Sequence, residues 1–193
     1  MTAPSRGRWT LEHKVAMRRN IIDLTLIQAG TGLRISEARR AWRGLVRDIG
    51  DRVSFDVHES IAKGRHPRLA HVLDDRVAWR IREILLLHPE DADEVLIGQV
   101  KDRTKTWDLS KVTDQARELY DQVAEELEIP KLSMPGLLTH IWRPTMNMQL
   151  MAAGVPGVAR AQQLGHTEQV AADYYTTAMP AELAAEARAL ITG

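Results

Sequence analysis

The spacing of apolar residues along the chain predicts a mainly helical protein. Apolar side chains recur at helical intervals over residues 10–29, and the segment runs into Gly30 and Gly32, residues that commonly end a helix. Ser36 is expected to cap a short second helix that runs through Trp42. Arg34 would then lie at the junction of two helices, a position suited to a functional side chain.

A change to a two-residue period predicts a small β-structure after these helices. Residues 53–57 alternate apolar and polar side chains, and residues 68–73 are compatible with a second strand. Residues 63–67, which include Gly64 and Pro67, form the turn region between them. The pattern therefore predicts an antiparallel hairpin or meander.

Helical periodicity returns over the rest of the chain. Asp74 or Asp75 is expected to cap a helix that ends near Leu87, and residues 88–109 are polar and irregular. Further helices are predicted over residues 110–128, 144–153, 156–164 and 180–191. The expected fold class is α+β, mainly α-helical, with residues 1–193 forming a single domain.

Pro144 constrains where one of these helices starts. Proline lacks a backbone N–H and is tolerated only in the first turn of a helix. We therefore expect the helix to begin at about residues 143–144, with His140 in the preceding segment.

Composition narrows the possible chemistry. The 193 residues are 44% hydrophobic, enough for one core, and no cysteine is present. Disulfides, thiolate metal sites and a cysteine nucleophile are thereby excluded, so covalent chemistry must use Ser, Thr, Tyr, Lys or a carboxylate. The longest aliphatic run, residues 84–87, is far too short to cross a membrane, and no signal-peptide pattern opens the chain. We expect a cytoplasmic protein with no membrane partner.

The formal net charge is zero, but the charges are unevenly distributed. Residues 1–82 hold 17 Lys and Arg against 9 Asp and Glu, whereas residues 83–193 hold 9 against 17. The basic half is compatible with a DNA-binding face and equally with ordinary solvated charge. Other features must decide between these interpretations.

Four short motifs carry a specific resemblance. Thr31-Gly-Leu-Arg-Ile-Ser-Glu37 lies in the N-terminal half, and His140-Ile-Trp-Arg143, Leu164-Gly-His166 and Tyr174-Tyr175 follow in the C-terminal half. Their order, their spacing and their residues resemble the catalytic domain of the tyrosine recombinases, the phage integrase family. That family has an Arg in a T-G-L-R-x-S-E segment, then H-x-x-R, L-G-H and a terminal Tyr. The likeness extends from about residue 12 to residue 190.

The resemblance implies a set of site residues. Ala62-Lys-Gly-Arg-His-Pro-Arg68 is similar to the family's G-K-G-x-x-x-R turn, apart from Ala62. Tyr175 is selected over Tyr174 by its spacing from the L-G-H segment. Arg65 and Arg68, which flank the turn, are candidates for DNA contacts. The implied catalytic residues are Arg34, Lys63, His140, Arg143, His166 and Tyr175.

The expected chemistry explains why these residue types would gather. Breaking a phosphodiester requires a nucleophile, neutralisation of the non-bridging oxygens and a proton for the departing 5′-oxygen. Arginines such as Arg34 and Arg143 donate paired hydrogen bonds to phosphate oxygens. Lys63 can supply the proton, the two histidines can hold phosphate oxygens or move protons, and Tyr175 attacks to give a 3′-phosphotyrosine. No metal ion or nucleotide cofactor is expected.

The leading hypothesis is a site-specific recombinase catalytic domain, acting on double-stranded DNA in integration, excision or resolution of a mobile element. The family's separate N-terminal core-binding domain is not expected in this chain, since only 33 residues precede Arg34. Taken singly, each candidate residue is better explained by a structural role, but the joint occurrence of all of them favours the catalytic interpretation. A non-catalytic DNA-binding accessory module and a type IB topoisomerase stay as alternatives.

The resemblance also implies an assembly. The working unit would be a homotetramer on DNA, while the isolated domain is expected to be mainly monomeric. The apolar stripe predicted over residues 181–191 either docks on a neighbouring subunit or folds back on its own domain.

Overall fold

The computed structural model describes residues 9–63, 66–87, 94–133 and 138–165 of the chain. The helix predicted over residues 180–191 lies outside these ranges. The α-helices are α1 (Leu11–Thr31), α2 (Ile35–Ala38), α3 (Asp75–Leu86), α4 (Leu109–Glu126), α5 (Trp142–Ala152) and α6 (Gly157–Leu164). The strands are β1 (Val46–Ile49), β2 (Arg52–Val57) and β3 (Arg68–His71), and 3₁₀ turns form η1 (Arg43–Leu45), η3 (Pro130–Ser133) and η4 (Leu138–His140).

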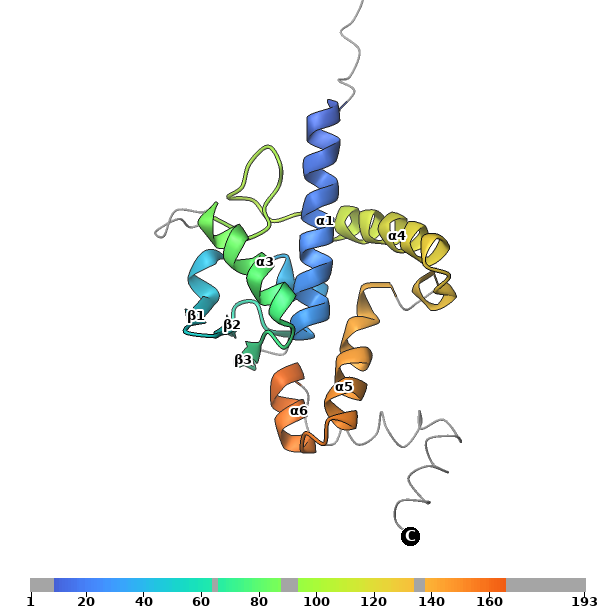
Figure 1. Ribbon diagram of the computed structural model, residues 1–193. Coiled ribbons are helices and arrows are strands. Elements are labelled where there is room, and N and C mark those ends of the chain that lie inside the picture. Colours follow the sequence, from blue (N-terminus) through green and yellow to red (C-terminus); the bar gives the residue numbers. More distant parts are fainter. Residues whose placement is uncertain (1–8, 64–65, 88–93, 134–137, 166–193) are drawn as a thin grey trace, which may run out of the picture.

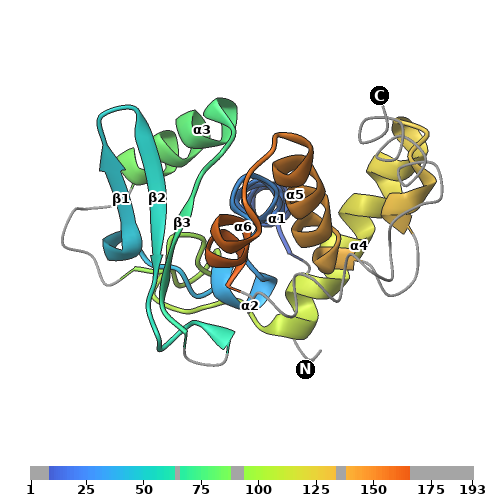
Figure 2. The same ribbon diagram turned by 90° about the horizontal axis from the view of Figure 1, so that it is seen from below.

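Helix α1 is the central element, with α3 and the sheet on one side and α4 and α5 on the other (Figures 1 and 2). Thr10 caps its start by accepting a hydrogen bond from the backbone N–H of His13 at 3.2 Å. Its buried stripe includes Ile21, Leu24 and Ile27, each 1% exposed. None of the helices in the described part of the chain is long and apolar enough to cross a membrane.

Gly32 ends α1 and lets other elements approach closely. Its φ of 71° lies in the left-handed region, which favours glycine. A Cβ at this position would lie 2.4 Å from Leu164 Cδ2 in α6 and 3.0 Å from Met146 Sδ in α5. The glycine of the T-G-L-R motif is therefore needed both for the backbone turn and for packing.

The β-structure is a three-stranded antiparallel meander in the order β1-β2-β3. Val46 of β1 pairs with Phe55 of β2, and Ser54 of β2 pairs with His71 of β3. Phe55 is 1% exposed, and β2 supplies the sheet's buried face. The meander confirms the predicted α+β, mainly helical fold and adds β1, a strand that the sequence pattern did not reveal.

Side-chain caps position the helix starts. Asp74 accepts hydrogen bonds from the N–H groups of Arg76 and Val77, which confirms the predicted start of α3. The expectation that Ser36 caps the second helix is wrong. Ser36 lies within α2, and Arg34 occupies the cap position, where its backbone N–H donates to Glu37 Oε2 at 2.9 Å. The Glu37 carboxylate thus satisfies the N–H of the cap residue, which is one half of the capping-box arrangement.

Pro144 lies in the first turn of α5, as the sequence predicts, because the helix begins at Trp142. The missing N–H therefore costs no internal hydrogen bond. The indole Nε1 of Trp142 donates to the hydroxyl of Tyr120 in α4 at 2.7 Å. This bond fixes the start of α5 against α4.

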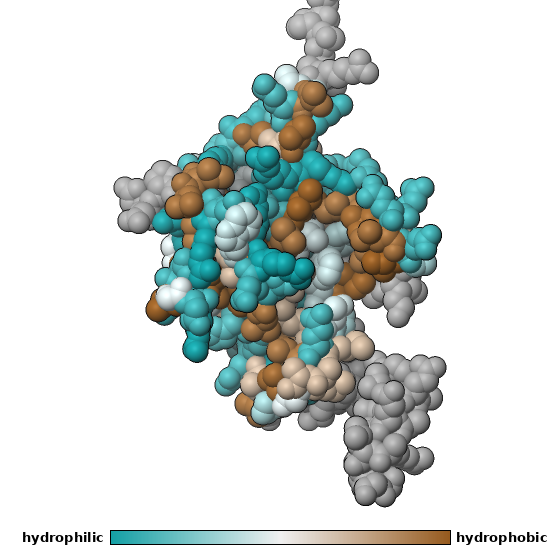
Figure 3. Space-filling model, in the orientation of Figure 1, coloured by the Kyte–Doolittle hydropathy of each residue, from teal (hydrophilic) through white to brown (hydrophobic). Residues whose placement is uncertain are grey.

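The surface carries a mixture of hydrophilic and hydrophobic residues (Figure 3). Hydrophobic residues gather near the end of α4, where Leu127 and Ile129 are 62% and 42% exposed. Scattered exposed apolar residues of this kind are normal in a globular domain.

Candidate active site

Several of the predicted site positions converge near the C-terminal end of α1. Arg34 directly precedes α2, Arg68 opens β3 and Arg143 lies in the first turn of α5. Figure 2 shows α2, α5 and α6 grouped around the end of α1. The fold brings these residues, which come from three separate sequence motifs, into one region.

Glu37 lies at the centre of this region and binds two of its arginines. Its side chain is fully buried and accepts hydrogen bonds from Arg68 Nη1 and Nη2, at 3.2 and 2.7 Å. Arg34 Nη1 donates to the same carboxylate at 3.1 Å. Charge-assisted bonds of this paired geometry fix both partners in orientation as well as in distance.

The electrostatics of Glu37 follow from these neighbours. Burial alone raises the pKa of the carboxyl group, but the hydrogen bonds and positive charges of Arg68 and Arg34 outweigh it. The pKa of Glu37 is lowered to about 2. The carboxylate is therefore ionised at neutral pH and compensates part of the arginine charge.

Lys63 is joined to the same carboxylate through its backbone. Its N–H donates to Glu37 Oε1 at 3.4 Å, while its side chain is exposed. Arg40 secures the adjoining segment, donating from Nη2 to the carbonyl of Ile61 at 2.7 Å and from Nε to that of Ser36 at 2.9 Å. The turn that carries Lys63 is thus tied to α2.

Arg143 is a buried cation held by backbone carbonyls. The residue is 6% exposed, Nη1 donates to the carbonyl of Gly32 at 2.7 Å, and Nη2 donates to that of Leu164. Burial lowers the pKa of Arg143 to about 9; the positive charges of Arg34 and Arg68 act in the same direction, and Glu37 opposes them. A guanidinium in these surroundings favours a nearby anion.

Gly165 of the L-G-H motif packs closely against the side chain of Arg68. It caps α6 at a φ of 63°, and a Cβ there would lie 2.8 Å from Arg68 Cζ. Arg68 Nε also donates to the carbonyl of Gln163 at 3.3 Å. The end of α6 therefore rests directly on the buried Arg68 side chain.

Two participants had no role assigned from the sequence. Glu37 was part of a motif, and its position three residues after Arg34 at a helix start was the available signal. Gln163 joins α6 to β3, accepting from the N–H of His71 at 3.0 Å and donating to its carbonyl at 2.8 Å. The side-chain amide of Gln163 therefore makes the pair of hydrogen bonds with His71 that a residue of a neighbouring strand would make. Nothing in the local sequence predicts this role.

The structure says less about the other predicted site residues. His140 is exposed and ends η4, two residues before the start of α5, whereas the adjacent Thr139 is 4% exposed. Arg65, His166, Tyr174 and Tyr175 lie outside the described residues. Within the described ranges, no group of three or more His, Asp or Glu side chains is arranged to hold a metal ion.

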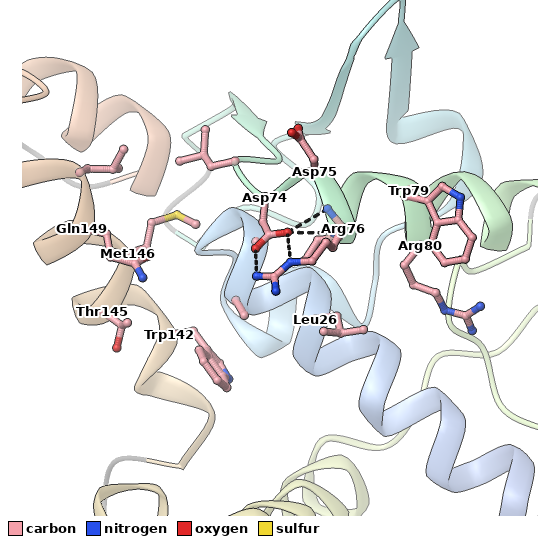
Figure 4. A pocket seen from close by; sticks show the side chains of 15 residues that line it. Leu26, Asp74, Asp75, Arg76, Trp79, Arg80, Trp142, Thr145, Met146 and Gln149 are labelled. Atoms are coloured by element: carbon pink, nitrogen blue, oxygen red, sulfur yellow. Dashed lines mark hydrogen bonds and ion pairs between the residues drawn. The ribbon is translucent and has the colours of Figure 1, made fainter. Parts of the chain in front are cut away.

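A cavity of about 1100 Å³ lies elsewhere, between α3 and α5 beside α1 (Figure 4). Trp79 and Arg80 of α3, Leu26 of α1, and Trp142 and Met146 of α5 are among its lining residues. It includes none of the predicted site residues. The arginine cluster around Glu37 is therefore separate from this cavity.

Comparison with solved structures identifies the architecture. The chain superimposes on the XerH site-specific recombinase, in a post-cleavage complex with palindromic difH substrate, with a TM-score of 0.71 over 97% of this chain. The sequence identity is 16%. The chain has the fold of a tyrosine recombinase catalytic domain.

Other recombinase structures agree with this assignment of the fold. The Tn1549 transposon integrase, in complex with circular intermediate DNA, matches with a TM-score of 0.56 and 16% identity over 95% of this chain and 65% of the integrase chain. XerA recombinase matches with a TM-score of 0.53 and 17% identity over 93% and 67% of the two chains. The chain spans about half of the XerH structure, 49%. No protein-family model matches the sequence, and no match is found among curated proteins.

Proposed function

We propose that this chain is the catalytic domain of a site-specific DNA recombinase that cleaves and rejoins DNA through Tyr175. The observation that carries the proposal is the placement of two arginines near one ionised carboxylate: Arg34 donates a hydrogen bond to Glu37, and the negative charge of Glu37 acts on Arg143. Both residues occupy the positions that the resemblance assigns to phosphate-binding arginines.

In the proposed reaction, Arg34 and Arg143 bind the non-bridging oxygens of the scissile phosphate. Their fixed guanidinium groups stabilise the negative charge that develops there. The phenolic oxygen of Tyr175 gives up its proton to His140 or His166 and attacks phosphorus, the bond from phosphorus to the 5′-oxygen breaks, and Lys63 protonates that oxygen. The product is a 3′-phosphotyrosine, which the 5′-hydroxyl of another strand attacks in the reverse step. His140 and His166 would hold phosphate oxygens or move protons.

Arg68 has a different role in this proposal from the one that the sequence indicated. Its side chain is 7% exposed and both of its terminal nitrogens bind Glu37. We propose that it holds Glu37, and through it Arg34, in place. A direct contact of Arg68 with DNA stays a prediction, as does the contact of Arg65.

The proposed substrate is double-stranded DNA. The XerH and Tn1549 integrase structures contain DNA, which supports this choice by fold analogy. Much of the positive charge in the basic half is used internally, since Arg80 pairs with Asp23 at 2.8 Å and Arg82 with Asp48 at 2.9 Å. Weak DNA binding is therefore expected. Since the attraction that is left is electrostatic, we expect it to fall steeply as salt is added. The role in a mobile element and the tetramer on DNA belong to the same proposal.

A nicked duplex tests this function, because the short strand released after cleavage diffuses away and traps the covalent adduct. Wild-type protein should accumulate a protein–DNA adduct. Arg34→Ala and Arg143→Ala should slow its formation about a hundredfold or more while weakening DNA binding far less. The exposed Arg117 of α4 provides a control, and Arg117→Ala should leave the rate unchanged.

The same assay separates the alternatives. Binding of DNA with no adduct from the wild-type protein would support an accessory module and contradict the proposal. Relaxation of supercoiled plasmid without strand exchange between duplexes would support a topoisomerase.

A further inference from the structure

A buried glutamine joins the two segments that carry Arg34 and His140. Gln28 lies in the last turn of α1 and is 1% exposed. Its Nε2 donates to the carbonyl of Leu33 at 3.2 Å and to the carbonyl of Thr139 at 3.1 Å. Each of these carbonyls belongs to the residue directly before a candidate catalytic residue.

The backbone of Gln28 strengthens the first of these links. Its carbonyl accepts from the N–H of Gly32 at 2.8 Å, so backbone and side chain together hold the turn that leads to Arg34. The second link spans 111 residues and ties α1 to the segment before α5. Because both hydrogens of one amide are used, movement of either carbonyl disturbs both bonds.

The surroundings make this amide hard to replace. Gln28 and Thr139 are both buried, so water does not readily replace the donor that these carbonyls would lose. Among the described residues, Gln28 Oε1 has no hydrogen-bond partner although it is buried. The side chain thus retains an unsatisfied polar atom, a cost that an apolar residue of similar shape would avoid. The need to fill space in the core therefore does not by itself explain why this residue is a glutamine.

We propose that Gln28 is a positioning residue that sets His140 relative to Arg34. Its Nε2 acts as a two-armed brace between the arginine turn and the histidine segment, and it contacts no substrate itself. This inference rests on the proposed function, in which both residues act at the same phosphate. Misplacement of a catalytic group by about 1 Å can cost a hundredfold in rate.

The test compares Gln28→Met with Asn20→Leu. Asn20 is also an α1 side-chain amide, and it donates to the carbonyl of Gly98 at 2.9 Å, remote from the site. Gln28→Met should slow adduct formation on nicked DNA at saturating protein about tenfold or more, with a change in DNA affinity below about threefold. Asn20→Leu should leave the rate unchanged.

A double-mutant cycle shows whether the effect passes through His140. In a His140→Ala background, Gln28→Met should slow cleavage less than about twofold, because no imidazole is left to position. If Gln28→Met slows cleavage as much in the His140→Ala background as in the wild type, the proposal is overturned. An equal decrease in rate from Asn20→Leu would also overturn it.

A measurement without activity separates this inference from the proposed function. The ring signals of His140 in an NMR spectrum, assigned with His140→Asn, should shift in Gln28→Met and stay in place in Asn20→Leu. An unmoved His140 signal in Gln28→Met overturns the brace even if the protein cleaves DNA. A shifted signal in a protein that forms no adduct supports the brace and contradicts the recombinase function. If Gln28→Met does not fold, Gln28→Asn, which keeps the amide but is too short for both carbonyls, provides the same comparisons.

Discussion

Glu37 and Arg68 form a buried, two-bonded ion pair across 31 residues of sequence, with Oε2 and Nη2 2.7 Å apart. The pair joins the helix start that presents Arg34 to the strand that follows Lys63. It also lies beneath the end of α6, since Gly165 contacts Arg68. One carboxylate thus holds together elements that carry three of the motifs.

Removing the charge of Glu37 should destabilise the fold strongly. Glu37→Gln leaves Arg68 buried without its counterion, and breaking a buried pair on one side costs about 3–5 kcal/mol. Urea denaturation measures the loss in the free energy of unfolding. Glu83, which pairs with Arg80 and is 38% exposed, provides the control, and Glu83→Gln should cost less than about 1 kcal/mol. Equal losses would show that the buried pair has no special importance.

The contribution of Glu37 should depend on pH in a defined window. Its pKa in the folded protein is about 2, below the ordinary value of 4.5. The unfolded state therefore binds the proton first, and the stabilisation is complete above about pH 5 and lost as the pH falls toward 2. The gap in unfolding free energy between wild type and Glu37→Gln should narrow over that range. A gap that stays constant from pH 6 to about 2.5 would contradict the assigned pKa.

Gly165 should tolerate no side chain because of Arg68. Gly165→Ala combines a left-handed backbone with a Cβ placed 2.8 Å from the guanidinium carbon. Gly154 has a φ of 75° and nothing within 4 Å of a Cβ, so Gly154→Ala isolates the backbone strain. We expect about 1 kcal/mol for Gly154→Ala and a clearly larger loss for Gly165→Ala, measured as free energies of unfolding. Identical losses would mean that the contact with Arg68 is unimportant.

Arg143 should make the folded domain bind phosphate. Burial lowers the pKa of its guanidinium to about 9, which means that the charged form is held at a cost that an anion offsets. Inorganic phosphate at ten times its Kd should stabilise the fold by about 1.4 kcal/mol beyond chloride at equal ionic strength. Thermal unfolding of wild type and Arg143→Gln measures this gain, which the variant should lack. A gain that survives in Arg143→Gln would place the anion elsewhere.

The sequence predicted the elements of the fold better than the contacts between them. Periodicity located α1, α3 and α4, and the restricted chemistry of Pro144 located the start of α5. The sequence did not predict strand β1, because this strand has no alternation of buried and exposed side chains that would show as a two-residue period. Val46 is half-buried and the next three residues are exposed.

The site was predicted only as far as motifs define it. The resemblance named Arg34 and Arg143; in the structure Arg34 donates a hydrogen bond to Glu37, and Arg143 lies near enough for the charge of Glu37 to act on it. The partner of Glu37 could not be inferred, because Arg68 is distant in sequence and was expected to contact DNA. Gln28 shows the same limit, since a lone polar residue in an apolar helix stripe reveals its role only when its partners are known.

The residue that becomes covalently attached to DNA decides whether Tyr175 is the nucleophile. The adduct trapped on nicked duplex is digested with protease, and the modified peptide is sequenced by mass spectrometry. We predict a phosphotyrosyl nucleotide on Tyr175, an adduct retained in Tyr174→Phe, and no adduct in Tyr175→Phe although that variant still binds DNA. Attachment at Tyr174 or at a serine, or an adduct that persists in Tyr175→Phe, would contradict it.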